Sequence, residues 1–247
     1  MRVKPAIMIP YAPIPGPLTL SRFIQRYNRF LLQVRLDVTG ECVDVHMADP
    51  GRLRELLLPG KRIWIRPAGN PGRKTRWTAV LVESPSGSEL VSLDTTLPNR
   101  LIAEALRQGA LEEFEGWTLE RPEFAFGSSR LDFLLTHESG RKAVLEVKSV
   151  TLVNDGVALF PDAVTKRGTR HLGELREIAE QPRWEAAVLF VLQRWDARRI
   201  RAAREIDLRF AESLEEAYAA GVRILGRRCR VGLEKVELGP PVPVEVG

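Results

Sequence analysis

Two acidic residues and a lysine stand in a pattern that could cut a phosphodiester bond. Glu146 and Lys148 lie two residues apart in Ala-Val-Leu-Glu-Val-Lys-Ser-Val, a segment apolar enough for a strand. Side chains alternate along a strand, so both would leave by the same face. Asp132 lies in an alternating segment, 129–135, and positions 132 and 146 are equidistant from Ser139. A hairpin folded about Ser139 would place Asp132 opposite Glu146.

Two carboxylates held this close repel each other unless a cation lies between them. Mg²⁺ and Mn²⁺ prefer oxygen ligands, and Mg²⁺ often takes one or two carboxylates together with phosphate oxygens and water. We therefore predict that Asp132 and Glu146 bind Mg²⁺ or Mn²⁺, which would activate a water and polarise a phosphate. Lys148 would stabilise the charged transition state. A cross-strand ladder of ion pairs fits the spacing equally well, because Glu-x-Lys is frequent by chance.

A charged helix is predicted downstream, over residues 164–180. Its apolar residues recur at helical spacing, so one stripe should be buried. Its charged residues form two neighbouring rows that could reach phosphates or a metal. The rows are Arg167, His171 and Glu174, and Lys166, Arg170 and Glu174. A solvated helix face with ion pairs one turn apart would explain the same pattern.

Several distinctive strings occur together along the chain. They are GSSRLDF (127–133), EVKSVTL (146–152), FPDAVT (160–165) and RGTRHLGEL (167–175), with NRF (28–30), HMADPGRL (46–53) and LPG (58–60) upstream. Jointly these strings resemble the sugar fermentation stimulation protein A family. The resemblance runs from about Arg22 to Leu225, which is nearly the whole chain.

The resemblance implies an α/β chain of two domains. The first would be an OB-fold barrel, and the second a restriction-endonuclease-like domain of the PD-(D/E)xK type. It also implies DNA binding with little sequence preference, and the family name carries a role in maltose metabolism. By position, Asp132, Glu146 and Lys148 match the nuclease signature, and Glu104 is the candidate for its accessory acid. The leading pair here is Leu131-Asp132 rather than Pro-Asp, which loosens the motif.

Basic residues throughout the chain are candidates for contacts with DNA phosphates. The turn at 49–51 would present Arg52, whose planar guanidinium can bind a phosphate with two hydrogen bonds. A salt bridge from Arg52 to Asp49 or Glu55 is the alternative. The full set of predicted nucleic-acid contacts is Arg29, Arg52, Arg130, Lys166, Arg167, Arg170 and His171.

The charge is concentrated in the first third of the chain. Residues 1–80 carry 14 Lys or Arg and 5 Asp or Glu, whereas the remainder carries 23 and 27. We therefore expect the N-terminal part to hold the nucleic acid. Genome composition or thermal adaptation could also produce an Arg-rich chain, but clustering argues modestly against that.

Five short alternating segments predict a small barrel: 30–36, 41–47, 62–65, 77–82 and 90–93. An OB-fold binds single strands by stacking bases on aromatic residues within a basic groove. The candidate aromatics are Tyr27, Phe30, Trp64 and Trp77. We expect most of them to lie in the barrel core, which would leave about one as a stacking platform.

The predicted domain plan has four parts. Residues 1–20 are an extended arm, 21–95 the OB-fold-like domain, 96–238 the nuclease-like domain and 239–247 a loose Pro-rich tail. Asn99 is expected to cap a helix over 100–108. A buried strand at 186–192 and an amphipathic helix at 207–220 complete an α/β pattern.

The length of 247 residues and 44% hydrophobic content suit two globular domains. No segment approaches the roughly 20 apolar residues of a membrane span. Prolines interrupt the apolar start, which disfavours a signal peptide, so we expect a cytoplasmic protein. Cys42 and Cys229 show no paired spacing and are expected to be buried and reduced. Many nucleases of this fold cut as homodimers, yet the periodicity reveals no interface.

Two hypotheses follow for the function. The first is a DNA-binding protein whose second domain hydrolyses phosphodiesters with Mg²⁺ or Mn²⁺. The second is a non-catalytic DNA-binding factor in sugar metabolism, in which the carboxylates only tune affinity. A sugar enzyme has little support, because the sequence contains no phosphate-binding glycine loop and no nucleophile elbow.

Overall fold

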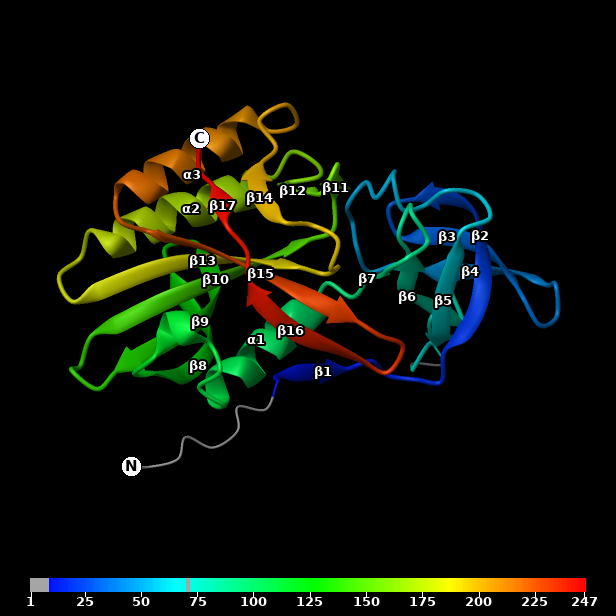
Figure 1. Cartoon of the computed structure of the whole chain (residues 1–247), viewed down its shortest axis with the longest axis horizontal. Coiled ribbons are helices and arrows are strands. Elements are labelled where there is room, and N and C mark those ends of the chain that lie inside the picture. Colours follow the sequence, from blue (N-terminus) through cyan, green and yellow to red (C-terminus); the bar gives the residue numbers. More distant parts are fainter. Residues whose placement is uncertain (1–8, 70–71) are drawn as a thin grey trace.

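The computed structural model describes residues 9–69 and 72–247, which form two domains lying side by side (Figure 1). The N-terminal domain is a β-barrel, and the C-terminal domain is a mixed sheet with helices on both faces. This is the α/β chain of two domains that the sequence predicts. Residues 1–8 of the predicted N-terminal arm lie outside the described residues.

Six strands build the N-terminal domain, in the order β4-β3-β2-β5-β6-β7. They are β2 (Thr19–Asn28), β3 (Leu31–Leu36), β4 (Cys42–His46), β5 (Arg62–Pro67), β6 (Trp77–Glu83) and β7 (Leu90–Ser92). Pairing of β4 with β6 closes β2 to β6 into a barrel. The five predicted strands are confirmed. Strand β2 was not predicted, because its many polar residues obscure the alternation.

Seven strands form the sheet of the C-terminal domain, in the order β1-β16-β15-β13-β10-β9-β8. They are β1 (Tyr11–Pro13), β8 (Trp117–Phe126), β9 (Ser129–His137), β10 (Lys142–Val150), β13 (Trp184–Leu192), β15 (Arg223–Val231) and β16 (Lys235–Pro241). The central strands β10, β13 and β15 are parallel. Strand β13 is buried on both faces, which explains its continuous apolar sequence.

Helices cover both faces of this sheet. Helix α1 (Leu97–Arg107), followed by the short 3-10 helix η1 (Glu112–Phe114), packs on one face. Helices α2 (Lys166–Ala179) and α3 (Leu208–Ala219) lie side by side on the other (Figure 1). The side chains of β10 alternate between these two faces of the sheet. Leu145 and Val147 pack on the α1 side, whereas Val144 packs in the core with α2 and α3.

Helix α1 begins earlier than predicted. It starts at Leu97, with Thr96 as the N-cap residue and Pro98 in the first turn. Proline fits there because the first N–H groups of a helix have no partner within the helix. The prediction that Asn99 caps this helix is therefore wrong. Asn99 lies inside the first turn, and its side chain is free for another contact.

Segments near both ends of the described chain join sheets. Strand β1 pairs with β16, although residues 1–20 were expected to form an arm. The expected loose tail also contains strand β17 (Val244–Glu245), which pairs with β14 (Arg199–Ala202). This small sheet is completed by β11 (Val153–Asn154) and β12 (Val157–Phe160). These segments are held by backbone pairing with strands that are distant in sequence. Their proline content alone does not reveal this pairing.

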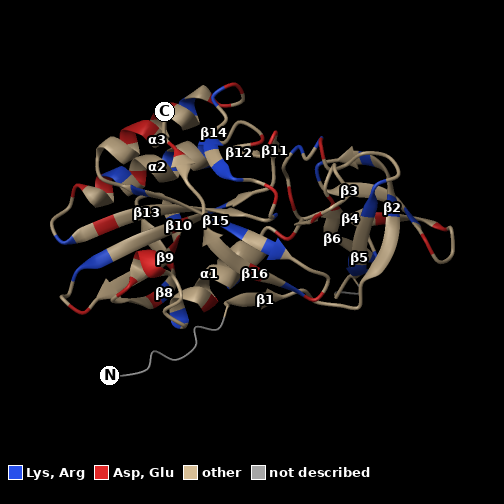
Figure 2. Ribbon diagram, viewed as in Figure 1, with Lys and Arg blue, Asp and Glu red and all other residues tan. Residues whose placement is uncertain are grey.

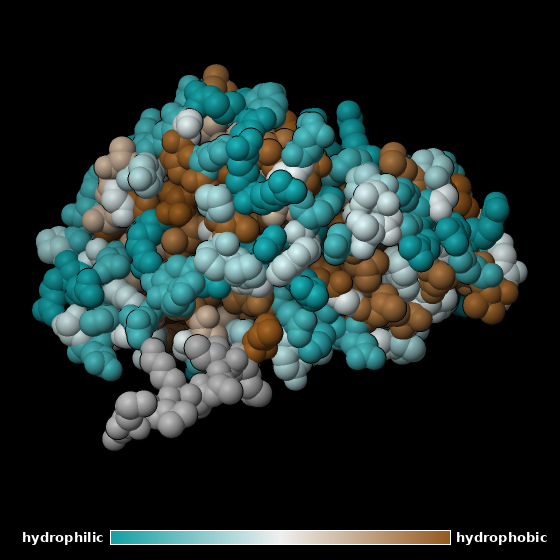
Figure 3. Space-filling model, viewed as in Figure 1, coloured by the Kyte–Doolittle hydropathy of each residue, from teal (hydrophilic) through white to brown (hydrophobic). Residues whose placement is uncertain are grey.

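An apolar junction connects the domains. Val80 and Leu81 of the barrel belong to the same buried cluster as α1 and the central sheet, and Trp64 packs against it. On the face in Figure 3, hydrophilic residues cover most of the surface and apolar residues form scattered patches. Cys229 is buried as expected, but Cys42 is exposed at the start of β4. Within the described ranges, no helix has the length and apolar character to cross a membrane.

Candidate active site

The hairpin of β9 and β10 brings the predicted acidic residues together. Its register pairs Phe133 with Leu145 and Thr136 with Lys142, so it is centred on Ser139 as the sequence predicts. One step beyond the Phe133–Leu145 pair, the Asp132 side chain accepts a hydrogen bond from the backbone N–H of Val147, at 2.7 Å. The hairpin thus places a carboxylate from each strand at one end of the sheet.

Asp132 is held from two sides. Its other carboxylate oxygen accepts a hydrogen bond from Asn99 Nδ2 at 2.6 Å, which ties the site to the first turn of α1. Burial raises the pKa of Asp132 to about 6, and the negative charge of Glu146 adds to this increase. The two hydrogen bonds and the charge of Lys148 oppose it. Asp132 therefore sits in a place where a further positive charge would be favourable.

Glu146 is almost fully buried, at 2% exposed. Its Oε1 accepts hydrogen bonds from Lys148 Nζ at 2.6 Å and from His171 Nδ1 at 2.5 Å. Burial opposes ionisation of Glu146, but the His171 hydrogen bond and the Lys148 charge outweigh it, so the pKa of Glu146 is lowered. The shared negative charge of the pair therefore resides mainly on Glu146.

The donor set fits a divalent cation. Glu146 Oε2 is buried and has no hydrogen-bond partner among the described residues, which is costly unless a ligand or water completes it. Each Asp132 oxygen keeps a second lone pair beside its hydrogen bond. Asp132 and Glu146 would supply the oxygen ligands, and the rest would come from water or phosphate. Within the described ranges, no group of three or more His, Cys, Asp or Glu side chains could hold a metal by itself.

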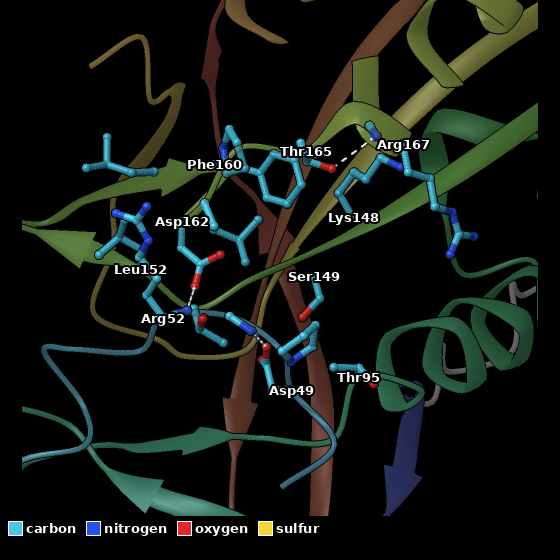
Figure 4. A pocket seen from close by; sticks show the side chains of 18 of the residues that line it. Asp49, Arg52, Thr95, Lys148, Ser149, Leu152, Phe160, Asp162, Thr165 and Arg167 are labelled. Carbon is cyan, nitrogen blue, oxygen red and sulfur yellow. Dashed lines mark hydrogen bonds between the residues drawn. The ribbon is translucent and has the colours of Figure 1, made fainter. Parts of the chain in front are cut away.

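A cavity of about 980 Å³ lies between the domains and opens onto this site. Asp132, Glu146 and Lys148 line it from the C-terminal domain, and Arg29 and Arg52 line it from the barrel. Figure 4 shows the loop around Arg52 on one side of the cavity and Lys148 with Arg167 on another. The cavity is therefore walled by both domains and has cationic groups on opposing sides.

A loop of the barrel, residues 49–52, is fixed against the C-terminal domain. The backbone N–H of Arg52 donates to Asp162 Oδ2 at 2.7 Å, and that of Gly51 donates to Asp49 Oδ1 at 2.8 Å (Figure 4). Arg26 Nη1 donates to the carbonyls of Gly51 and Arg52 at 2.7 and 2.8 Å. A side chain at Gly51 would clash with the Asp162 carboxylate. A Cβ at position 51 would therefore force the Asp49 and Asp162 side chains to move.

The structure divides the predicted nucleic-acid contacts into two groups. Arg29, Arg52 and Arg167 line the cavity. The other predicted residues are outside its lining. Lys166 is exposed on α2, Arg130 is exposed beside Glu123, Arg170 Nε donates to Ser129 Oγ, and His171 is 1% exposed. The first group therefore lies next to any ligand held inside the cavity.

His171 has a different environment from the one predicted. It is buried between Glu146 and Arg167, whose Nε lies 3.3 Å from His171 Nε2. Because Arg167 can only donate, Nε2 must accept, and Nδ1 then donates to Glu146. The predicted helix row is correct, but it directs His171 at the carboxylate. A direct contact with nucleic acid is excluded by its burial in this conformation.

Glu104 does not join the group. It lies on α1, its side chain is 42% exposed, and it interacts with Arg107 and Gln108 of the same helix. It is absent from the cavity lining. Asn99, one and a half turns earlier on the same helix, makes the contact with Asp132 instead.

Three residues of the site have no signal in the sequence pattern. They are Asn99, Arg26 and Asp162, which hold Asp132 and the 49–52 loop. Asp162 lies in the string FPDAVT and Asn99 follows a proline, but strings alone do not reveal their partners. Each acts across a large sequence separation that only the packed domains create.

The comparisons with known proteins agree with this architecture. Residues 24–93 match the family described as "SfsA N-terminal OB domain", and residues 96–235 match "Sugar fermentation stimulation protein RE domain". The "Sugar fermentation stimulation protein homolog" of Shouchella clausii is 47% identical and the alignment covers 93% of this chain and 98% of the relative. That of Moorella thermoacetica is 44% identical, with 94% and 99% covered.

A solved structure with a similar fold is described as Pyrococcus furiosus SfsA in complex with Ca²⁺. It has a TM-score of 0.82 and 28% sequence identity, and the match covers 97% of this chain and 99% of that one. Both domains are therefore shared in full with these relatives. The chain belongs to the sugar fermentation stimulation protein (SfsA) family, with an N-terminal OB domain and a C-terminal restriction-endonuclease-like domain.

Proposed function

We propose that this protein binds DNA between its two domains and hydrolyses phosphodiester bonds with Mg²⁺ or Mn²⁺ at Asp132 and Glu146. One observation carries the proposal. The two carboxylates and Lys148 line a cavity that also contains arginines, and the buried Glu146 Oε2 lacks a partner among the described residues. Such an unpaired oxygen beside a second carboxylate suits a cation that arrives with the substrate.

Each residue has a distinct part in this proposal. Asp132 and Glu146 hold the cation, and Asn99 and His171 fix the orientation of their carboxylates through hydrogen bonds. A bound cation would supply water activation and neutralisation of charge on the phosphate. Lys148, which the Glu146 hydrogen bond orients, stabilises the charge that develops on the phosphate oxygens. Arg167 and Arg52 hold the flanking phosphates.

The related structure from Pyrococcus furiosus supports the use of a divalent cation, since it was solved in complex with Ca²⁺. Ca²⁺ and Mg²⁺ share a preference for oxygen ligands, but Mg²⁺ requires a smaller and more regular arrangement. We therefore expect Ca²⁺ to bind at the same carboxylates here and to support DNA binding. We expect Mg²⁺ or Mn²⁺ to be required for cleavage.

The test is a cleavage assay of the full chain with single-stranded, duplex and branched DNA in the presence of Mn²⁺. Asp132→Ala should reduce the cleavage rate by at least about 100-fold, because the metal site loses one of its two carboxylates. Glu104→Ala is the matched control, since this acid is exposed and outside the cavity, and it should retain activity. Undiminished cleavage by Asp132→Ala would reject the assigned site.

A non-catalytic DNA-binding factor is the second candidate. It is favoured by the absence of a three-ligand metal group within residues 9–69 and 72–247 and by the direct Lys148–Glu146 contact. Titration calorimetry with Mn²⁺, in the presence and absence of DNA, separates the candidates. Divalent binding that disappears in Asp132→Ala supports the nuclease. A wild-type protein that binds DNA but no divalent cation supports the binding factor.

A further inference from the structure

We propose that the substrate enters as single-stranded DNA, with an unpaired base stacked on Phe30 at the tip of the β2–β3 hairpin. This inference deepens the proposed function and rests on it, because it names the form of DNA that the same cavity receives. It is drawn from a pair of exposed aromatic residues and from the cationic wall that continues from them into the cavity.

The hairpin tip, residues 27–30, presents two large aromatic side chains to solvent. Tyr27 is 50% exposed and Phe30 is 49% exposed. The other two candidate aromatics of the barrel have packing roles, Trp64 at the domain junction and Trp77 against the barrel core. The structure therefore leaves only the hairpin tip, among those four aromatics, to stack on a base.

Phe30 is held in a fixed position. Its N–H donates to Asn28 Oδ1 at 2.9 Å, and its carbonyl accepts from the N–H of Met47 at 3.0 Å. Its ring stacks on His46, with centroids 6.3 Å apart and planes 20° apart. One side of the ring is thus supported while about half of its side chain remains open. A rigid, open aromatic face binds a base with little loss of conformational entropy.

Arg26 connects the hairpin tip to the cavity. Its guanidinium donates to the carbonyls of Asn28 and Arg29 at 3.1 and 2.8 Å, and to those of Gly51 and Arg52 at 2.7 and 2.8 Å. One side chain therefore holds the aromatic tip and the 49–52 loop in a fixed relation. That loop also contacts the C-terminal domain through Asp162. A strand bound at the tip is consequently aligned with the cavity.

Positively charged side chains extend from the hairpin tip into the cavity. Arg29, Arg52 and Arg54 line the cavity, and none of these three side chains makes an ion pair or hydrogen bond with another described residue. Figure 2 shows basic residues on β2, which carries Arg22 and Arg26. Free guanidinium groups beside an aromatic platform match a polynucleotide backbone with splayed bases. In a duplex both faces of each internal base are already stacked, so its bases cannot use the Phe30 ring.

The test is fluorescence anisotropy of the full chain, in EDTA, with labelled oligo(dT) and with a blunt duplex of equal charge. Phe30→Ala should weaken oligo(dT) binding by roughly 10-fold or more, the effect of losing one base–aromatic stack. Duplex binding should change by less than about twofold, and Phe30→Trp should retain wild-type affinity for oligo(dT). Tyr218→Ala, which removes an aromatic that is 59% exposed on α3, is the matched control and should bind both probes normally.

Equal loss of affinity for both probes in Phe30→Ala, or no loss for oligo(dT), would overturn the inference. Should Phe30→Ala not fold, Phe30→Leu, which keeps an apolar side chain but removes the ring, takes its place and should weaken oligo(dT) binding selectively. Binding in EDTA is independent of cleavage. A failure of the nuclease proposal would therefore leave this binding result unchanged.

Discussion

The two carboxylates of the candidate site share their negative charge unequally. Glu146 receives the hydrogen bonds of Lys148 and His171 and stays ionised, whereas the pKa of Asp132 is raised to about 6 by burial and by the neighbouring charge. Folding removes solvent from both carboxyl groups, so the difference arises from which of them lies next to the cations. At the scale of single residues, the positive charge near Asp132 is therefore too weak to offset its burial.

Asp49 allows a related effect to be measured away from the proposed metal ligands. Burial raises its pKa from 3.8 to about 6, and the charge of Asp162 adds to this. The folded state therefore binds this proton more tightly than the unfolded state does. The resulting stabilisation is complete below about pH 4 and is lost as the pH rises through 6.

Asp49→Asn should consequently raise the free energy of unfolding at pH 7.5 by about 3 kcal/mol. The amide oxygen can still accept the Gly51 N–H hydrogen bond, and the buried charge is removed. The gain should shrink towards zero near pH 4. Urea unfolding at both pH values measures it, with Asp44→Asn, at an exposed position on β4, as the control. A variant less stable than the wild type at pH 7.5 would contradict this assignment.

Among the helices, α2 contributes most to the site. Its buried face carries His171 to Glu146, and its N-terminus is capped by Thr165, whose side chain accepts from the Gly168 N–H at 3.0 Å. Gly168 also faces Phe210 of α3, so the helices approach closely at this point. The position of His171 therefore depends on a glycine one turn earlier.

Two glycines of α2 should respond in opposite directions to alanine. At Gly168 a new Cβ would lie 2.8 Å from Thr165 Cγ2 and 3.2 Å from Phe210 Cδ2, which should destabilise the protein by about 1–3 kcal/mol. At Gly173 a Cβ meets no described atom within 4 Å apart from its chain neighbours and the backbone of its own helix. Alanine there should stabilise the helix by about 1 kcal/mol. Urea unfolding followed by circular dichroism tests both, and a shared sign would refute the packing argument.

At the scale of the whole molecule, the chain crosses between the domains twice. Strand β1 belongs to the C-terminal sheet, β2 to β7 form the barrel, and α1 returns to the C-terminal domain. The apolar cluster around Val80 and Leu81 and the Asp162 contact to the 49–52 loop add to this connection. The cavity is thus framed by two domains whose relative positions are held at several points.

This geometry predicts how salt affects DNA binding. Arg52 lines the cavity without an ion pair to any other described residue, so it is free to neutralise a phosphate. Arg52→Ala should reduce the slope of log K against log salt by about 1. Arg209→Ala removes an exposed arginine from α3, outside the cavity, and should leave the slope unchanged. Anisotropy titrations over a salt series measure both slopes, and equal slopes for Arg52→Ala and wild type would remove Arg52 from the binding path.

The sequence by itself determined the local geometry of the site. Residues 129–135 and 143–150 alternate as strands, and the turn between them is centred on Ser139. This pattern sufficed to place Asp132 opposite Glu146, because strand period and turn position are properties of neighbouring residues. The barrel strands, the buried strand β13 and the α2 row that contains His171 were predictable for the same reason. The motifs also sufficed to indicate the family.

Only the tertiary structure decided which distant groups complete the site. Asn99 reaches Asp132 across 33 positions and Asp162 reaches Arg52 across 110, whereas Glu104 remains outside. The tertiary structure also buried His171 against Glu146 and left Phe30 exposed. These outcomes depend on how helices and domains pack against one another, and no periodicity in a single segment encodes the contact partner of a side chain.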